Sequence, residues 1–286
     1  MKNFIRKLFT KRPLEEILVF LLARSTDNYL LTRIRPSNNL YSTPAMRTCT
    51  REGIHYYLDI SDYQNWLIYF NSNADSSLGV LNYINAGDIV FDVGGNIGQT
   101  ALTLSKKLAG KGMIYSFEPY PATYDKLMGN LLLNPELHKN IKPINSGMGE
   151  KPAMLKMIKH SKSNSGSNRI LGSNVPMSNE LTEVTVSTID IFVESNSIQR
   201  VDLIKIDVEG FEMQVLKGAM NTLLSCRPKL FIELNDSSLK EQGSSSAELV
   251  DLLKGLGYSI LEDGKSEELK DDIHRHMDIV CKYARV

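Results

Sequence analysis

A glycine-rich turn follows a predicted buried strand that carries one acidic residue. Gly94, Gly95 and Gly98 form the turn, Asp92 lies two residues before the first of them, and residues 97–108 then have the apolar spacing of a helix. Glycines let the backbone turn sharply and approach a ligand closely, and the first N–H groups of the helix face that ligand. The pattern therefore predicts a binding site for a nucleotide-like cofactor.

Two acidic residues narrow the kind of cofactor. A carboxylate at Asp92 would repel the pyrophosphate of a dinucleotide, but it suits the cationic sulfonium and amino groups of S-adenosylmethionine (SAM). Glu118 ends the next strand, where an acidic side chain can hold both ribose hydroxyls. The spacing from Asp92 to Gly98 resembles the acidic-x-Gly-x-Gly-x-Gly signature of SAM methyltransferases, with Asn96, which tolerates a left-handed backbone, in place of the middle glycine. Ser146, at the end of the third strand, completes the predicted cofactor site.

Further carboxylates stand where the later strands end. Asp207 follows the buried run of residues 201–206, and Glu209 lies two residues on, at the start of the next helix. Ligands of open α/β folds bind at this edge of the sheet, so both carboxylates are candidates to take a proton from the substrate. Their structural alternatives are pairing of Asp207 with Lys205 and of Glu209 with the helix N-terminus. His55, in the N-terminal region, is a third candidate base.

A metal site is a second hypothesis for the same edge. Glu233 ends the strand after Asp207, and Asn235 comes just beyond it. Oxygen ligands of this kind suit Mg²⁺ or another divalent cation, and a cation held by Asp207, Glu233 and Asn235 would lower the pKa of an acceptor hydroxyl. The alternative is that Glu233 and Asn235 bind substrate hydroxyls or cap a loop.

The regular order of predicted elements positions these residues. From Leu78 onward, five strands alternate with helical patterns, which predicts a doubly wound, mostly parallel sheet of the Rossmann-like type. The last two strands, 258–261 and 277–282, are joined by a segment too short for a crossover helix, so they should form an antiparallel hairpin at the sheet edge. That ending resembles the class I methyltransferase fold, whose seven-stranded sheet has one reversed strand.

An insertion separates the third and fourth strands, at about residues 150–187. Segments 154–159 and 183–186 look like two strands, and the residues between them, 161–179, are rich in Ser, Asn and Gly. A loop of this length is typical of a substrate lid, with Arg169 among the groups that could bind a glycan. Plain disorder fits the same composition.

Four short motifs resemble the FkbM family of methyltransferases. They are the runs 203–212 and 215–219, the tripeptide Phe117-Glu118-Pro119 and the run 186–190, and the resemblance covers roughly residues 76 to 262. It implies a SAM-dependent O-methyltransferase acting on a hydroxyl of a sugar, a glycan or a related natural product. An NAD-dependent oxidoreductase and a catalytically silent binding module with the same fold are the alternatives.

The N-terminal region, residues 1–75, is predicted to be a small helical cap before the methyltransferase domain of residues 76–286. It contains a strand at 56–60 and a helix at 63–70. In residues 1–24, basic side chains alternate with aromatic and aliphatic ones before an apolar helix. This pattern fits peripheral contact with an anionic membrane, packing against the chain's own domain, or a homo-oligomer interface.

Composition limits the partners and the location. The 286 residues are 42% hydrophobic and 23% charged, with a net charge of zero, so no general attraction to nucleic acid is expected. The three cysteines contain no Cys-x-x-Cys pair, which favours a reducing cytoplasm over a disulfide framework or a zinc site. The longest apolar run near the N-terminus, Ile17 to Ala23, is too short to span a bilayer. We therefore expect a cytoplasmic protein, peripheral at the inner face of the membrane if residues 1–24 bind lipid.

Overall fold

The computed structural model describes residues 2–24, 29–70, 76–158, 168–170, 181–269 and 273–284. These residues fall into two compact units, which we call the first unit (within residues 2–70) and the second unit (from Ser76 onward). No helix in these ranges is both long and apolar enough to cross a bilayer.

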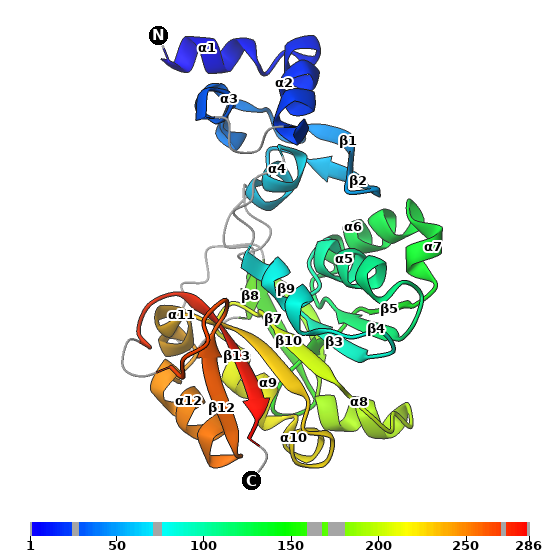
Figure 1. Ribbon diagram of the computed structural model, residues 1–286, viewed down its shortest axis with the longest axis vertical. Helices are drawn as coiled ribbons and strands as arrows, with labels where there is room; N and C mark the ends of the chain where they lie inside the picture. Colours follow the sequence, from blue (N-terminus) through cyan, green and yellow to red (C-terminus); the bar gives the residue numbers. More distant parts are fainter. Residues whose placement is uncertain are drawn as a thin grey trace. The chain divides into compact units, whose positions relative to one another are not determined.

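The first unit combines short helices with one antiparallel hairpin (Figure 1). Its elements are α1 (Lys2–Leu8), α2 (Arg12–Arg24), α3 (Tyr29–Ile34), η1 (Asn38–Leu40), β1 (Met46–Arg51), β2 (Ile54–Asp59) and α4 (Tyr63–Tyr69). Asp62 caps α4 by accepting the N–H of Asn65, and the indole N–H of Trp66 donates to the carbonyl of Pro36 at 2.9 Å. These bonds satisfy polar groups that the small core would otherwise leave unpaired.

The second unit is built on a seven-stranded sheet in the order β12-β13-β11-β10-β3-β4-β5 (Figure 1). Its strands are β3 (Ile89–Val93), β4 (Met113–Phe117), β5 (Ile141–Ile144), β10 (Leu203–Ile206), β11 (Lys229–Leu234), β12 (Tyr258–Glu262) and β13 (Met277–Tyr283). β13 runs antiparallel to both of its neighbours, and all other pairs are parallel. The predicted fold class, with its reversed C-terminal strand, is confirmed. β12 lies at the edge, and β13 is inserted between it and β11.

Helices connect these strands and bury apolar side chains against them. They are η2 (Ser76–Tyr83), α5 (Gln99–Leu108), α6 (Pro121–Leu132), α7 (Pro135–His138), α8 (Ile189–Ser195), α9 (Glu212–Lys217), α10 (Met220–Cys226), α11 (Asp236–Glu241) and α12 (Ser246–Gly255). Phe192 of α8, for example, packs edge-on against Phe91 and Phe117 of the neighbouring strands β3 and β4. The central strands are apolar almost throughout because both of their faces are covered.

The strand order reverses between β3 and β10. From β3 the chain builds outward through β4 to β5, and it then returns to the other side of β3 to build β10 and β11. In such sheets the loops after the two strands at the reversal diverge and leave a crevice in which ligands bind. The segments that follow β3 and β10, beginning at Gly94 and Asp207, therefore meet at the expected ligand site.

The insertion forms a separate four-stranded sheet in the order β6-β9-β7-β8. Its strands are β6 (Gly147–Met148), β7 (Ala153–Ile158), β8 (Arg169–Ile170) and β9 (Leu181–Ser187). The two predicted strands are thus present as β7 and β9. Arg169, which we placed in a loop, instead pairs in β8 with Ile158. The rest of the predicted lid, residues 161–167 and 171–179, lies outside the described residues.

Candidate active site

The turn after β3 is fixed by backbone hydrogen bonds. The N–H groups of Gly94 and Gly95 both donate to the carbonyl of Phe117, at 3.0 and 2.9 Å. Gly94 has φ +89°, and a Cβ there would lie 1.9 Å from the carbonyl oxygen of Asp207. Glycine is therefore required both by the left-handed backbone and by the close approach of the segment after β10.

Asn96 and Gly98 complete the turn and start helix α5. Both have left-handed backbones, with φ +44° and +87°, so asparagine does replace the middle glycine in the conformation that it tolerates. No side chain caps α5 at Gly98. The side-chain oxygen of Asn96 is buried without a hydrogen-bond partner among the described residues. A buried acceptor without a hydrogen bond lowers the stability of a protein, and a ligand that donates a hydrogen bond to it would remove that cost.

Glu118 ties the turn to the end of β4. One carboxylate oxygen accepts the N–H of Asn96 and the other accepts the N–H of Tyr120, each at 2.9 Å. Burial raises the pKa of Glu118 to about 7, against the opposing effect of these hydrogen bonds. Each oxygen keeps a second lone pair. The predicted contact with ribose hydroxyls thus remains a prediction, and Glu118 also has a structural role that the sequence did not suggest.

A buried lysine lies at the centre of the site. The Lys205 ammonium donates to the carbonyl of Gly94 at 3.0 Å and lies 3.2 Å from Asp207 Oδ2 and 3.6 Å from Asp92 Oδ1. Burial alone would lower the pKa of Lys205, but the charges of Asp207 and Asp92 outweigh it and the pKa is raised. The predicted alternative for Asp207, an ion pair with Lys205, is therefore present.

Asp92 is fully buried at the end of β3. Its Oδ2 accepts a hydrogen bond from the hydroxyl of Ser116 at 2.8 Å, whereas Oδ1 has no hydrogen-bond partner among the residues that the structure describes. Burial raises the pKa of Asp92, and Lys205 opposes this effect. We predicted a cationic ligand beside this carboxylate, and the cation that the chain itself places there is Lys205.

The turn after Asp207 is organised by a second buried carboxylate. Glu212 Oε1 accepts the N–H groups of Val208 and Gly210, at 3.2 and 3.0 Å, while Oε2 has no partner within the described chain. Gly210 has φ +100°, and a Cβ there would lie 2.4 Å from the carbonyl oxygen of Ser238. Glu212 thus determines the path of the backbone that presents Glu209.

Glu209 has the proton affinity of a group that exchanges protons near neutral pH. It is half-buried, with a left-handed backbone at φ +54°. Burial raises its pKa to about 8, and the nearby charges of Glu233 and Asp207 add to the effect. A carboxyl with such a pKa can accept a proton from a substrate and release it again, so Glu209 is a candidate general base.

The three predicted metal ligands do not fit a cation site. Asp207 pairs with Lys205, Glu233 Oε1 lies 2.8 Å from His276 Nε2, and Asn235 caps helix α11 by accepting the N–H of Ser238 at 3.3 Å. Over the described ranges, no three His, Cys, Asp or Glu side chains are grouped to hold a metal. The capping alternative for Asn235 is correct because its side-chain oxygen completes the first turn of α11.

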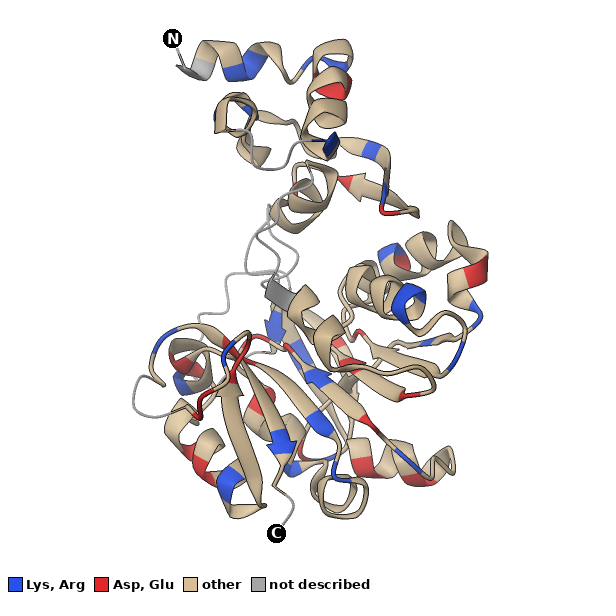
Figure 2. Ribbon diagram, in the orientation of Figure 1, with Lys and Arg blue, Asp and Glu red and all other residues tan. Residues whose placement is uncertain are grey.

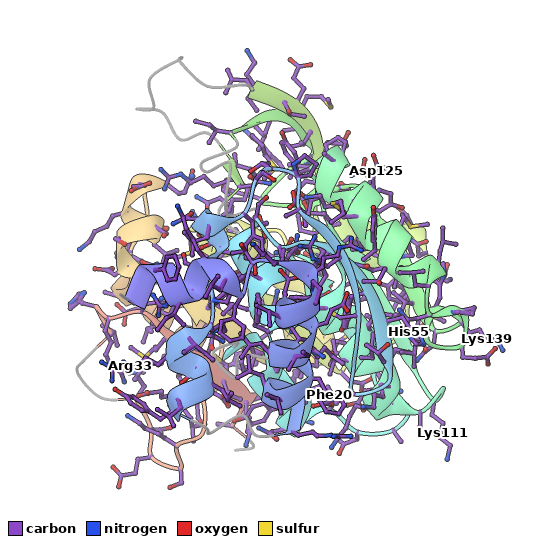
Figure 3. The ribbon with its side chains drawn as sticks, turned by 90° about the horizontal axis from the view of Figure 1, so that it is seen from above. Phe20, Arg33, His55, Lys111, Asp125 and Lys139 are labelled. Atoms are coloured by element: carbon purple, nitrogen blue, oxygen red, sulfur yellow. The ribbon has the colours of Figure 1, made fainter. Side chains whose placement is uncertain are left out.

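Ser146 and His55, the remaining predicted site residues, have other hydrogen-bond partners. The Ser146 hydroxyl donates to the carbonyl of Thr185 at 3.2 Å, which links the end of β5 to the insertion sheet. His55, labelled in Figure 3, belongs to the first unit, on the exposed face of β2, with Nδ1 2.9 Å from the hydroxyl of Thr50. Their predicted roles in cofactor binding and catalysis remain predictions.

Sequence reasoning missed the supporting residues of the site. Lys205 could have been noticed, because it stands between apolar residues in the predicted buried run from Val201 to Ile206. A buried charge requires a partner. Glu212 and Ser116 gave no comparable signal, because a carboxylate at a helix start and a serine in a strand usually have ordinary surface roles.

Known proteins resemble this chain over the same region. The sequence model of the family described as "Methyltransferase FkbM domain" matches residues 92–260. The hexuronic acid methyltransferase AglP of Haloferax volcanii is 31% identical over 138 residues, which are 48% of this chain and 52% of that protein. Methyltransferase 1 of Beauveria bassiana is 27% identical over 166 residues, 52% of this chain and 65% of its own length. The chain thus spans about half to two thirds of these relatives.

A solved structure covers more of the chain at lower identity. The crystal structure of methyltransferase FkbM from Methylobacillus flagellatus KT aligns with 77% of this chain and 55% of its own, with 18% identity and a TM-score of 0.48.

Proposed function

Because the chain belongs to the FkbM methyltransferase family, we propose that it transfers a methyl group from SAM to a hydroxyl of a sugar, a glycan or a related natural product. The observation that carries this proposal is the meeting of the Gly94–Gly98 turn with the segment after β10 at the reversal of strand order. The relative AglP is named as a hexuronic acid methyltransferase, which supports a sugar acceptor.

Several groups around the glycine turn suit a SAM molecule. The glycine turn would receive it, with the open start of α5 behind the turn. Asp92 and Asn96 each have a buried oxygen without a hydrogen-bond partner among the described residues, and these acceptors suit a ligand that donates from amino and hydroxyl groups. Glu118 would accept from the ribose hydroxyls with its remaining lone pairs. When bound, SAM supplies an electrophilic methyl group.

The side chains after β10 would act on the acceptor. Glu209 would accept the proton of the attacking hydroxyl, because its raised pKa gives it enough basicity for that step near neutral pH. The Lys205 ammonium holds Asp207 in place at the edge of the site, where a carboxylate can orient the same hydroxyl. Asp207 and His55 are the other candidates for the base.

Cofactor titration separates the proposed function from an oxidoreductase. In isothermal titration calorimetry the full chain should bind SAM tightly and NAD weakly or not at all, since the buried carboxylate at Asp92 disfavours a pyrophosphate. Tight binding of NAD without binding of SAM would overturn the proposal.

Transfer to an acceptor separates an enzyme from a silent binding module. The protein should move label from methyl-labelled SAM to free sugars, hexuronic acids or glycan extracts, and mass spectrometry of the product should place the methyl group on oxygen. Binding of SAM without transfer to any of these acceptors would favour the silent module.

A further inference from the structure

Helix α2 of the first unit has two apolar stripes. Leu18 and Leu22 are almost completely buried in the unit's own core. Leu14, Ile17 and Leu21 form a second stripe with the same spacing, and they are 39%, 55% and 41% exposed. Successive residues lie about 100° apart around a helix, so the second stripe lies beside the buried one, with Ile17, the most exposed of the three, farthest around the helix from Leu18 and Leu22.

The neighbouring helices add to this exposed surface. Phe4 and Leu8 of α1 are 67% and 37% exposed. The Arg6 side chain donates to the carbonyl of Arg33 at 3.2 Å, which joins α1 to α3. Phe20 of α2 is 51% exposed, and the guanidinium of Arg24 lies 3.8 Å from its ring centre. Figure 3 shows Phe20 and Arg33 on their helices. We call the set Phe4, Leu8, Leu14, Ile17, Phe20 and Leu21 the helical face.

The charge around the helical face is strongly positive. Residues 2–35 contain eight basic residues, which are Lys2, Arg6, Lys7, Lys11, Arg12, Arg24, Arg33 and Arg35, and three acidic ones. One of the three, Glu15, is buried in an ion pair with Arg47 and does not neutralise the surface. Figure 2 shows basic residues along α1 and at the start of α2.

We propose that the helical face binds the surface of an anionic lipid bilayer. The aromatic and aliphatic side chains would enter the boundary between headgroups and acyl chains, while Lys7, Lys11 and Arg12 would lie among the anionic headgroups. Charge favours a membrane over a second copy of this chain. A two-fold dimer through this face would place the same positive surface against itself, and like charges repel. This proposal is independent of the proposed function.

Vesicle sedimentation with the full chain tests the proposal. The protein should bind vesicles made of equal parts phosphatidylglycerol and phosphatidylcholine, should bind phosphatidylcholine vesicles weakly, and should be released by raised salt. The double variant Lys7→Glu and Lys11→Glu should bind the anionic vesicles at least about tenfold more weakly. The double variant Ile17→Ser and Phe20→Ser should lose most of the binding, because it removes the apolar contribution.

Matched controls distinguish the helical face from net charge and from unfolding. Lys107→Glu with Lys111→Glu changes the net charge equally at exposed positions of the second unit and should bind as the wild type does (Lys111, Figure 3). Circular dichroism should report folded protein for every variant. Absence of wild-type binding to anionic vesicles, or equal losses in the control and the Lys7/Lys11 variant, would overturn the proposal. A change of mass in light scattering on Ile17→Ser with Phe20→Ser, without vesicle binding by the wild type, would assign the face to self-association.

Discussion

At the scale of single residues, Glu209 is the most direct test of the chemistry. Glu209→Gln keeps the size of the side chain but cannot accept a proton, so turnover should fall about 10²-fold or more with little change in SAM affinity. Because the pKa of Glu209 is about 8, wild-type turnover should rise as the pH passes through that value and then level off. The variant should lose this dependence. Measurements of kcat against pH with a sugar acceptor, together with SAM titration, check both statements.

A control variant and further substitutions help to interpret the result. Glu150→Gln changes an exposed carboxylate elsewhere in the second unit and should behave as the wild type does. If Glu209→Gln retains normal turnover with an unchanged pH profile, the proton acceptor is another group. Asp207→Asn and variants of His55 would then identify it.

Asp92 should affect both cofactor binding and stability. Asp92→Asn should weaken SAM binding by about 1.5–3 kcal/mol, as expected for the loss of a charge-assisted hydrogen bond. The buried contact with Lys205 predicts a loss of stability as well, of up to about 3–5 kcal/mol, because it leaves the ammonium with Asp207 as its remaining ion-pair partner.

A double-mutant cycle separates these two effects. Asp92→Asn combined with Lys205→Met should cost less stability than the two single changes added together, since the second change removes the uncompensated charge. Urea unfolding of the four proteins measures the difference. Additive losses would show that the two residues do not interact, and an unchanged SAM affinity in folded Asp92→Asn would remove Asp92 from the cofactor site.

The sequence predicted which residues lie near the candidate site, but it did not predict which groups they form hydrogen bonds with. Asp92, Asn96, Asp207 and Glu209 could be placed because each lies at the end of a recognisable strand or just after one. Their hydrogen bonds depend on where β3, β4 and β10 come together in space, which no local pattern records. The predicted metal ligands illustrate this point, because the side-chain oxygen of Asn235 accepts a hydrogen bond from the helix that follows, which the sequence did not reveal.

At the scale of elements, the turn from Asp207 to Gly210 should make stability depend on pH. Burial raises the pKa of Glu212 to about 7, well above its usual value near 4.3, so between these values the native state keeps a proton that the unfolded chain has lost. This contribution to stability is fully present at low pH, and it is lost as the pH rises through about 7. Glu212→Gln removes it while keeping an oxygen for the N–H groups of Val208 and Gly210.

The comparison across pH is the measurement. The free energy of unfolding of Glu212→Gln, relative to that of the wild type, should be higher at about pH 8 than at about pH 5. This difference in free energy should change by up to about 1.4 kcal/mol per pH unit between the two pKa values. The exposed variant Glu150→Gln should show no such trend. A constant difference between Glu212→Gln and wild type at all pH values would contradict the pKa assigned to Glu212.

The turn after β3 should not tolerate a side chain at its first glycine. Gly94→Ala places a Cβ 1.9 Å from the carbonyl oxygen of Asp207 in a left-handed backbone, so it should abolish SAM binding and destabilise the second unit. Gly129→Ala is a matched control in helix α6, where an added Cβ meets nothing within 4 Å. It should stabilise by about 0.5–1 kcal/mol. Normal SAM affinity in Gly94→Ala would show that the two segments can separate.

The elements themselves were largely predictable. Apolar runs that end at polar residues located β3, β4, β10 and β11, and the short link before β13 indicated the reversed strand. The pairing of Arg169 in β8 was not predictable. A strand of two residues in a polar segment has no periodicity to detect, and it forms because β7 offers it an edge.

At the scale of the whole molecule, residues 1–24 are an integral part of the first unit. Basic and apolar side chains in this segment predicted an amphipathic surface, and that surface is present. Glu15, however, is fully buried, 2.5 Å from the Arg47 guanidinium and 3.1 Å from the hydroxyl of Tyr69. Its partners lie 32 and 54 residues away along the chain, so only the folded first unit reveals them. Removing residues 1–24 would therefore disturb the unit rather than release an appendage.

Glu15→Gln tests how the first unit is held together. The variant leaves the Arg47 guanidinium, which is mostly buried, without its carboxylate, and it should destabilise the first unit by up to about 3–5 kcal/mol. Trp66 is the one tryptophan of the chain and lies in helix α4 of this unit, so its fluorescence reports the unfolding of the first unit specifically. The fluorescence transition should move to lower urea in Glu15→Gln and should stay in place in Glu16→Gln, which changes the exposed neighbour. Because all predicted cofactor residues lie in the second unit, SAM affinity should be nearly the same in both variants at low urea. Coincident transitions for Glu15→Gln and Glu16→Gln would show that the buried ion pair contributes no net stability to the first unit.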